Sequence, residues 1–306
     1  MQPIVVDNIV MKYRVKKTVV DALKGISFSV DKGEIFGIIG PDGAGKTSLF
    51  RILTTLLLAE SGEASVDGFD VVKDFIDIRN RVGYMPGRFS LYQDLSVQEN
   101  LEFFATIFNT SIEENYDLVK DIYIQIEPFK TRRAGQLSGG MKQKLALCCA
   151  LIHKPSVLFL DEPTTGVDAV SRKEFWEMLH RLKEQEITIL VSTPYMDEAS
   201  LCDRVALLQK GEILSVNTPK GIISEFKKPL WAVKANDMFR LMNAIKEDPS
   251  VESCYPFGQH HHVVFKSAEN GKEKLGQIAQ KGNFSQVEIT SIEPNIEDCF
   301  MALMKE

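Results

Sequence analysis

The sequence predicts an α/β fold with a parallel sheet, and three observations support this prediction. Short apolar runs typical of buried strands recur along the N-terminal part of the chain, at residues 35–39, 157–160, 187–191 and 205–208. Segments with helical spacing of apolar residues separate these runs. A glycine-rich string, Gly40-Pro41-Asp42-Gly43-Ala44-Gly45-Lys46-Thr47, follows the first run and precedes a helical pattern at 48–53. Because strands and helices alternate, a layered α/β core is expected.

A segment from about residue 88 to residue 155 differs from the rest of this core, because its apolar residues follow helical spacing. Two groups of residues carry the pattern: Leu101, Phe104, Ile107 and Phe108, and then Leu145, Leu147, Ala150 and Leu151. We therefore expect a helical subdomain inserted in the α/β core.

Beyond residue 225 the chain is expected to form a separate domain. After a connector at Lys227-Lys228-Pro229, the pattern predicts a strand, a helix over 238–246, two strands, a second helix and a last strand. A final helix is expected to begin near Glu293 and to carry Phe300, Leu303 and Met304. The predicted organisation is a nucleotide-binding core at residues 1–225 and a small α+β domain at 226–306.

Composition limits the partners that the chain can have. Its 306 residues include 42 acidic and 36 basic side chains, a formal net charge of −6, which argues against a nucleic-acid partner. No apolar run approaches the roughly 18 residues of a membrane span, and the N-terminus lacks the pattern of a secretory signal. The five cysteines show no C-x-x-C spacing, which fits buried, reduced thiols in a cytosol.

The glycine-rich string fits the phosphate-loop pattern G-x-x-x-x-G-K-[ST]. In such a loop the backbone N–H groups surround the phosphates, Lys46 neutralises the charge of the β- and γ-phosphates, and Thr47 offers its hydroxyl to Mg²⁺. The predicted nucleotide-binding residues are Gly40, Pro41, Asp42, Gly43, Ala44, Gly45, Lys46, Thr47 and Ser48. A chance glycine turn is the alternative, but it does not account for the flanking strand and helix.

Two acidic residues end the apolar run at 157–160. A buried strand rarely ends in two adjacent charges without a use for them. Asp161 is placed to bind Mg²⁺, and Glu162, on the opposite side of the strand, is placed to activate water as a general base. Pro163 is expected to keep Glu162 extended. The alternative is a pair of exposed acids at a strand end.

A second string, Leu137-Ser138-Gly139-Gly140, stands before a helical pattern. The free N–H groups of a helix N-terminus attract anions, which makes Ser138, Gly139 and Gly140 candidates for a phosphate contact. The alternative is an N-capped helix whose glycines allow close packing.

The phosphate loop, the Leu-Ser-Gly-Gly string and the strand ending in Asp161-Glu162-Pro163 occur in an order that resembles the ATP-binding-cassette (ABC) ATPases. The resemblance covers roughly residues 4–224, and the chain's last segment, residues 292–300, resembles the C-terminal domain of the drug-export, daunorubicin-resistance-like branch. It implies a P-loop NTPase core of ABC-ATPase type that uses ATP and Mg²⁺. It also implies two cassettes, identical or different, that meet head to tail, so that Ser138, Gly139 and Gly140 clamp the ATP of the partner.

Two more site residues follow from this resemblance. The string Thr164-Thr165-Gly166-Val167-Asp168 resembles the family's loop after the Asp-Glu pair, which makes Asp168 a dimer-loop residue. Tyr13 occupies the place of an aromatic ring that stacks on adenine, with a half-buried strand aromatic as the alternative.

Two positions depart from the family pattern. Gly87 replaces a Gln that touches Mg²⁺ and the attacking water, and Pro194 replaces a His that senses the γ-phosphate. Neither residue has a side-chain donor. Nucleotide binding with slow hydrolysis is therefore expected, and Arg88 and Gln93 are candidates to replace the lost groups.

The function implied is that of the cytoplasmic ATP-hydrolysing subunit of a multidrug-type exporter, peripheral on the inner face of the cell membrane. Its partners are a second cassette and a separate multi-span permease, whose coupling helix is expected to dock at residues 87–95; packing against the helical subdomain is the alternative for that segment. The rival function is a nucleotide-binding structural half with a slow site of its own. A cassette acting on ribosomes or DNA is a third possibility, but no second cassette or long coiled coil is present.

The run His260-His261-His262 raises the question of a metal site. His260 and His262 share one face of a strand, but no Cys or acidic residue stands at a supporting spacing. A solvated strand edge is therefore expected here.

Overall fold

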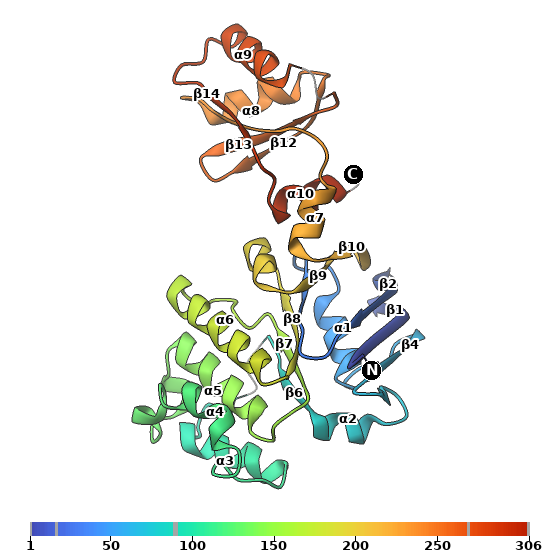
Figure 1. Cartoon of the computed structure of the whole chain (residues 1–306), viewed down its shortest axis with the longest axis vertical. Coiled ribbons are helices and arrows are strands. Elements are labelled where there is room, and N and C mark those ends of the chain that lie inside the picture. Colours follow the sequence, from blue (N-terminus) through green and yellow to red (C-terminus); the bar gives the residue numbers. More distant parts are fainter. Residues whose placement is uncertain (1, 16–17, 88–90, 268–269, 305–306) are drawn as a thin grey trace. The chain divides into compact units, whose positions relative to one another are not determined.

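The computed structural model describes residues 2–15, 18–87, 91–267 and 270–304. The chain divides into two compact units, one ending at Pro219 and the other beginning at Lys220, whereas the expected boundary lies between residues 225 and 226. Figure 1 shows the elements of both units.

Among the described residues, the first unit contains a six-stranded sheet with the order β10-β9-β3-β8-β7-β6. All neighbouring strands are parallel except β10, which is antiparallel to β9. The strands are β3 (Ile35–Ile39), β6 (Val82–Met85), β7 (Val157–Asp161), β8 (Thr188–Thr193), β9 (Arg204–Gln209) and β10 (Glu212–Asn217). Strands β3, β7 and β8 are buried along their whole length, which explains why their sequences are apolar runs rather than alternating patterns.

A second sheet of the first unit is antiparallel, with the order β2-β1-β4-β5 in the described part of the chain. Its strands are β1 (Ile4–Val15), β2 (Thr18–Val30), β4 (Ser61–Val66) and β5 (Phe69–Asp70). Its buried side chains join those of α1 (Lys46–Leu53) and of the central sheet in one apolar core. In this core the rings of Phe50 and Phe159 pack edge to face, with centroids 6.1 Å apart. This contact helps to hold α1 against β7.

The predicted helical segment lies together at one end of the first unit (green in Figure 1). It contains α3 (Val97–Ile107), α4 (Tyr116–Tyr123), α5 (Gly139–Leu151) and the short turns η1 (Glu127–Phe129) and η2 (Ala134–Gln136). Helices α3 and α4 both contact α5. Ser96 and Glu99 form a capping box at the start of α3. Ile107, expected on the apolar face, is instead 58% exposed.

The other helices of the first unit connect strands of the two sheets. They are α2 (Phe75–Arg81), α6 (Ala169–Glu184) and η3 (Met196–Leu201), and α7 (Pro219–Glu225) begins where this unit ends. Helix α6 packs on β3 and β8, and Asp168 caps its N-terminus by accepting from the N–H groups of Val170 and Ser171.

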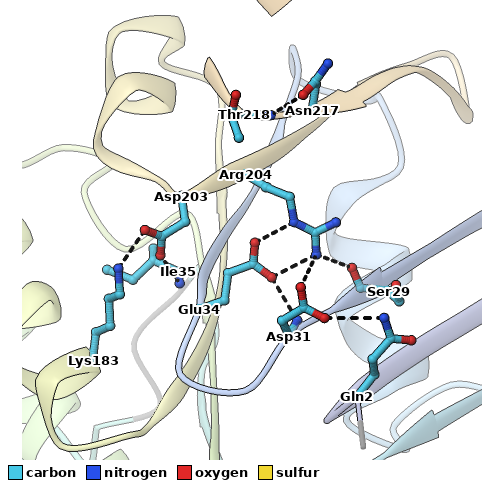
Figure 2. A network of polar contacts seen from close by, with 10 residues as sticks. All are labelled: Gln2, Ser29, Asp31, Glu34, Ile35, Lys183, Asp203, Arg204, Asn217 and Thr218. Atoms are coloured by element: carbon cyan, nitrogen blue, oxygen red, sulfur yellow. Dashed lines mark hydrogen bonds and ion pairs between the residues drawn. The ribbon is translucent and has the colours of Figure 1, made fainter. Parts of the chain in front are cut away.

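Arg204, at the start of β9, ties the two sheets together (Figure 2). Its guanidinium donates to both carboxylate oxygens of Glu34, at 2.7 and 2.9 Å, and to the carbonyl of Ser29 in β2, at 2.9 Å. The neighbouring Asp203 accepts from the N–H of Ile35 at 2.9 Å. These bonds fix the beginning of β3, whose other end leads into the phosphate loop.

The second unit has the predicted α+β arrangement. Its described strands form an antiparallel sheet with the order β12-β13-β11-β14, and the chain order strand, helix, two strands, helix, strand is that of a split β-α-β unit. The elements are β11 (Leu230–Lys234), α8 (Met238–Lys246), β12 (Val251–Phe257), β13 (His260–Phe265), α9 (Gly271–Lys281), β14 (Glu288–Ile292) and α10 (Ile296–Leu303). Helices α8 and α9 share a buried apolar cluster with one face of this sheet.

The histidine run does not lie at a solvated strand edge, so that expectation is wrong. Strand β13 pairs with β12 on one side and β11 on the other, and His261 and His262 are only 4% and 6% exposed. Nδ1 of His262 lies 2.6 Å from Oδ1 of Asp298, which also accepts from the hydroxyl of Tyr255 at 2.6 Å. Within the described ranges, no group of three or more His, Cys, Asp or Glu side chains could hold a metal ion.

The five cysteines are buried and free, as expected. Burial raises the pKa of the Cys254 and Cys299 thiols to about 11, so both remain protonated near neutral pH. None of the helices in the described part of the chain has the length and apolar character needed to span a membrane.

Candidate functional site

The phosphate loop joins β3 to α1, as its motif predicts. Two of its glycines are required by close contacts: a Cβ on Gly40 would lie 2.1 Å from the carbonyl oxygen of Leu208, and one on Gly45 would lie 2.4 Å from that of Ala22. Gly45 also has a φ of 112°, which side chains disfavour. The loop is therefore packed tightly against the strand end and the antiparallel sheet.

Lys46 lies at the centre of the site and is only 3% exposed. Its ammonium donates to the carbonyl oxygens of Gly40 and Pro41, at 2.8 and 3.1 Å. It also forms an ion pair with Oε1 of Glu162 at 3.0 Å. The phosphate loop and the acidic strand end, predicted from separate strings, thus meet at one cation.

Asp161 ends β7 and is almost completely buried. Its Oδ1 accepts a 2.6 Å hydrogen bond from the hydroxyl of Ser192. Burial raises the pKa of Asp161, and the nearby side chains of Ser192 and Thr47 partly offset that rise. The structure therefore places Thr47 and Asp161, the two residues predicted to hold magnesium, near each other.

Ser192 is a site residue that sequence reasoning missed. It lies in β8, next to β7 in the sheet. Its hydroxyl bonds Asp161 and also accepts from the N–H of Glu162 at 3.0 Å. The available signal was the polar pair Ser192-Thr193 at the end of an apolar run.

Glu162 is not extended, so that expectation is wrong. Its φ is +51°, in the left-handed region. The N–H of Glu162 donates to the carbonyl and the hydroxyl of Ser192, at 3.1 and 3.0 Å, and its carbonyl accepts from the N–H of Thr165 at 3.2 Å. These three bonds override the preference that Pro163 imposes, and they turn the side chain of Glu162 toward Lys46.

The Leu-Ser-Gly-Gly string starts α5, and Ser138 caps that helix by accepting from the N–H of Met141 at 3.3 Å. A Cβ on Gly140 would lie 2.8 Å from the hydroxyl oxygen of Ser171, and this hydroxyl donates to Asp168 at 2.7 Å. The predicted clamp and the predicted dimer-loop residue are therefore neighbours within one chain.

The remaining predicted positions lie around this centre. The hydroxyls of Tyr13 and Ser48 are 3.1 Å apart, which places Tyr13 beside the phosphate-loop helix. Gly87 is exposed, and a Cβ there would lie 3.2 Å from the carbonyl oxygen of Asp161 and 3.9 Å from Cβ of Glu162. Pro194 directly follows β8 and is half-buried. Stacking of Tyr13 on adenine remains a prediction.

A groove of about 330 Å³ lies between β6 and the helical segment. Leu56, after α1, and Arg79, in α2, also line it, and Phe104 and Cys149 line it from α3 and α5. Leu91, from the segment predicted to receive a permease, also lines it.

Two residues named for that segment, Arg88 and Phe89, lie outside the described residues, so their predicted roles stay predictions. The side-chain amide of Gln93 donates to the carbonyl of Leu91 at 3.3 Å.

Comparison with known proteins places this geometry in a family. A family model described as "ABC transporter" matches residues 23–165. The chain is 36% identical over 287 residues to the probable multidrug ABC transporter ATP-binding protein YbhF of Escherichia coli (strain K12), covering 92% of this chain and 49% of YbhF. It therefore spans about half the length of that relative.

Two further comparisons agree. The daunorubicin resistance ATP-binding protein DrrA3 of Streptomyces coeruleorubidus is 35% identical over 225 residues, which is 72% of this chain and 70% of DrrA3. The dimeric ATP-binding cassette MJ0796, bound to ADP and Pi, superposes with a TM-score of 0.64 at 25% identity, covering 70% of this chain and 98% of that structure. The chain belongs to the ATP-binding proteins of ABC transporters.

Proposed function

We propose that the chain binds and hydrolyses ATP and that it drives an exporter together with a second cassette and a multi-span permease. The observation that carries this proposal is the meeting of Lys46, Thr47, Asp161 and Glu162 at the ends of β3 and β7, the strands on either side of β8. These four side chains are those required to hold a triphosphate with its metal and to activate a water. We assign the cassette to residues 1–225 and an appended domain to 226–306.

The residues at the strand end fit Mg²⁺. The hydroxyl of Thr47 and the carboxylate of Asp161 are hard oxygen donors, which Mg²⁺ prefers, and they already lie near each other. Bound Mg²⁺ would neutralise phosphate charge.

The chain's own residues have distinct parts in the reaction. Lys46 binds the triphosphate, and because the same ammonium pairs with Glu162 at 3.0 Å, the phosphates compete with that carboxylate. A released Glu162 then accepts the proton of the attacking water as a general base. The bonds from Ser192 keep the backbone of Glu162 in place during this change.

We assign Ser138, Gly139 and Gly140 to the nucleotide of the second cassette. The N-terminus of α5 offers free N–H groups to an anion, and Asp168 lies beside it through Ser171. The dimeric state of MJ0796 supports this assignment. Tyr13 is assigned to the adenine, and the second cassette is either a copy of this chain or a relative.

Export is proposed because YbhF is named for multidrug transport and DrrA3 for daunorubicin resistance. A permease would hold the chain at the cytoplasmic face of the membrane. We assign its coupling helix to the 330 Å³ groove, whose lining is largely apolar and whose rim includes Leu56, 59% exposed.

This docking is tested with two exposed leucines. Leu56→Asp is expected to abolish binding of the purified chain to its permease while ATP affinity stays unchanged. Leu58→Asp is the matched control, because Leu58 is 68% exposed and does not line the groove. Equal loss of permease binding in both variants would contradict the assignment.

A second candidate function is a nucleotide-binding half whose own site turns over slowly. The observation in its favour is that Gly87, a position without a donor, adjoins Glu162, and that Pro194, the other such position, follows two residues after Ser192, which accepts from the N–H of Glu162. Phosphate release by the purified chain, alone and with its permease, separates the two candidates. If the chain turns over ATP and Glu162→Gln abolishes that turnover, the ATP-hydrolysing subunit is supported. If turnover appears only with a second, different cassette, the nucleotide-binding half with a slow site is supported.

A further inference from the structure

A buried carboxylate outside the phosphate-binding cluster has no role yet. Glu198 lies in η3, four residues after Pro194, and is 1% exposed. Its Oε2 accepts from the hydroxyl of Thr164 at 3.1 Å, and its Oε1 lies 3.6 Å from Nε of Arg172 in α6. One carboxylate therefore contacts two elements that are far apart in the sequence.

The contact between Glu198 and Arg172 is incomplete. Among the described residues, Oε1 of Glu198 and Nε of Arg172 are both buried without a hydrogen-bond partner, although they face each other. The guanidinium is held nearby through a 3.4 Å bond to Asp197 and a position 4.3 Å from the ring centroid of Tyr195. An unmade bond between buried groups is unfavourable, and a shift of a few tenths of an ångström would make this one. The pair is thus observed in a loose arrangement, and a tight one is within reach of a small shift.

The two partners of Glu198 lie close in sequence to Glu162 and to Asp168. Thr164 is two residues after Glu162, and the segment between them is held by Gln143, whose side chain donates to the carbonyl of Pro163 at 2.7 Å. The N–H of Arg172 donates to the carbonyl of Asp168 at 2.9 Å. Glu198 therefore connects the loop of the proposed base to the dimer-loop segment.

We propose that Glu198 is a positioning residue. Its carboxylate, shared by Thr164 and Arg172, holds the loop of Glu162 in register with the segment of Asp168, and the bond to Arg172 closes when nucleotide joins two cassettes. This inference rests on the proposed function of the site. Gly87 and Pro194 cannot hold the water or the γ-phosphate with a side chain. The position of Glu162 therefore depends more on contacts within the chain, such as those of Glu198, than it would if a side-chain donor stood at these two positions.

The first test follows Trp176, one turn after Arg172 on α6. Its indole is 2% exposed and its Nε1 has no hydrogen-bond partner among the described residues, so it reports a movement of this helix. The chain has two tryptophans, and Trp231→Phe leaves Trp176 as its only tryptophan, which is excited selectively over the tyrosines. In a Glu162→Gln background, MgATP is expected to shift its emission, and Glu198→Gln is expected to remove the shift without changing ATP affinity.

Two outcomes of the fluorescence test overturn the proposal: no shift in the parent variant, or a shift that persists in Glu198→Gln. This test needs no hydrolysis. A chain that binds ATP but never releases phosphate would therefore refute the proposed ATPase activity and leave the positioning role measurable.

The second test separates positioning from stability. Glu198→Gln is expected to lower kcat about 10- to 100-fold with KM for ATP unchanged, because a small misplacement of the base slows the chemical step. Adding Arg172→Gln removes the cation that has lost Glu198 as a partner and is expected to restore the melting temperature but not kcat. Recovery of kcat together with stability would overturn the proposal.

Lys183→Met serves as the matched control. Lys183 pairs with Asp203 at 2.6 Å (Figure 2). It lies in the last turn of α6, whereas the loop of Glu162 leads into the first turn. Loss of that ion pair is expected to leave kcat and the Trp176 signal unchanged. A fall in kcat equal to that of Glu198→Gln would show that the loss of any ion pair that holds α6 lowers kcat, which contradicts the proposal.

Discussion

Two groups of positions in the proposed nucleotide site differ. In the first group, Lys46, Thr47, Asp161 and Glu162 are all present, and Lys46 pairs with Glu162. In the second group, Gly87, next to Glu162, and Pro194, directly after β8, offer no side-chain donor. Affinity and turnover therefore depend on separate groups, and a chain can keep the first while reducing the second.

The largest effect on turnover is expected when the proposed general base is replaced. Glu162→Gln is expected to lower phosphate release about 10²- to 10⁴-fold, the usual contribution of a general base, while ATP remains bound. Rapid-quench phosphate assays and nucleotide-binding titrations measure the two effects. Unchanged release in this variant would remove Glu162 from its proposed role.

The next largest effect is expected on ATP affinity, when the lysine of the phosphate loop is replaced. Lys46→Ala removes charge-assisted bonds to the phosphates, which are worth about 3 kcal/mol together, so ATP affinity is expected to fall about 100-fold or more. Isothermal titration calorimetry checks this, with Lys24→Ala, an exposed ion-paired lysine outside the loop, as the control. Equal affinities of the Lys46 variant and the wild type would contradict the account.

The positions that lack a side-chain donor are tested by adding a hydrogen-bond donor at one of them. Pro194→His is expected to raise kcat about tenfold, below the 10²- to 10³-fold value of a preorganised donor, because the surrounding loop has formed around proline. Pro194→Ala, which adds no donor, is expected to give no gain. Equal rates for the two variants would show that the missing histidine does not limit turnover.

The smallest effect is expected at the clamp. Ser138→Ala removes the cap of α5, which stabilises the helix by about 1 kcal/mol, and leaves ATP binding to the isolated protomer unchanged. Thermal unfolding measures the first and sedimentation with MgATP measures the weaker dimer. A tenfold change in the affinity of the isolated protomer would place Ser138 in the chain's own site instead.

Local signals made much of the fold predictable. The phosphate loop, the buried strands and the start of α5 each depend on residues adjacent in the sequence, and all three were found. The sheet order was not available from such signals, which is why the burial of His261 and His262 in an inner strand was missed.

Contacts between distant segments account for the other differences. Ser192 and Glu198 act on the loop of Glu162 from β8 and η3, and nothing near Glu162 in the sequence indicates them. The φ of Glu162 follows from bonds to Ser192 rather than from the preference imposed by Pro163. The types of the site residues were thus predictable, but the contacts that orient them were not.

The most direct test of the central claim is a single-turnover measurement on Gly87→Gln/Pro194→His, with Gly87→Ala/Pro194→Ala as the control. The account predicts that the first variant cleaves bound ATP faster than the wild type and the control while its ATP affinity stays the same. An unchanged cleavage rate, or a faster rate explained by tighter ATP binding alone, would contradict the separation of affinity and turnover.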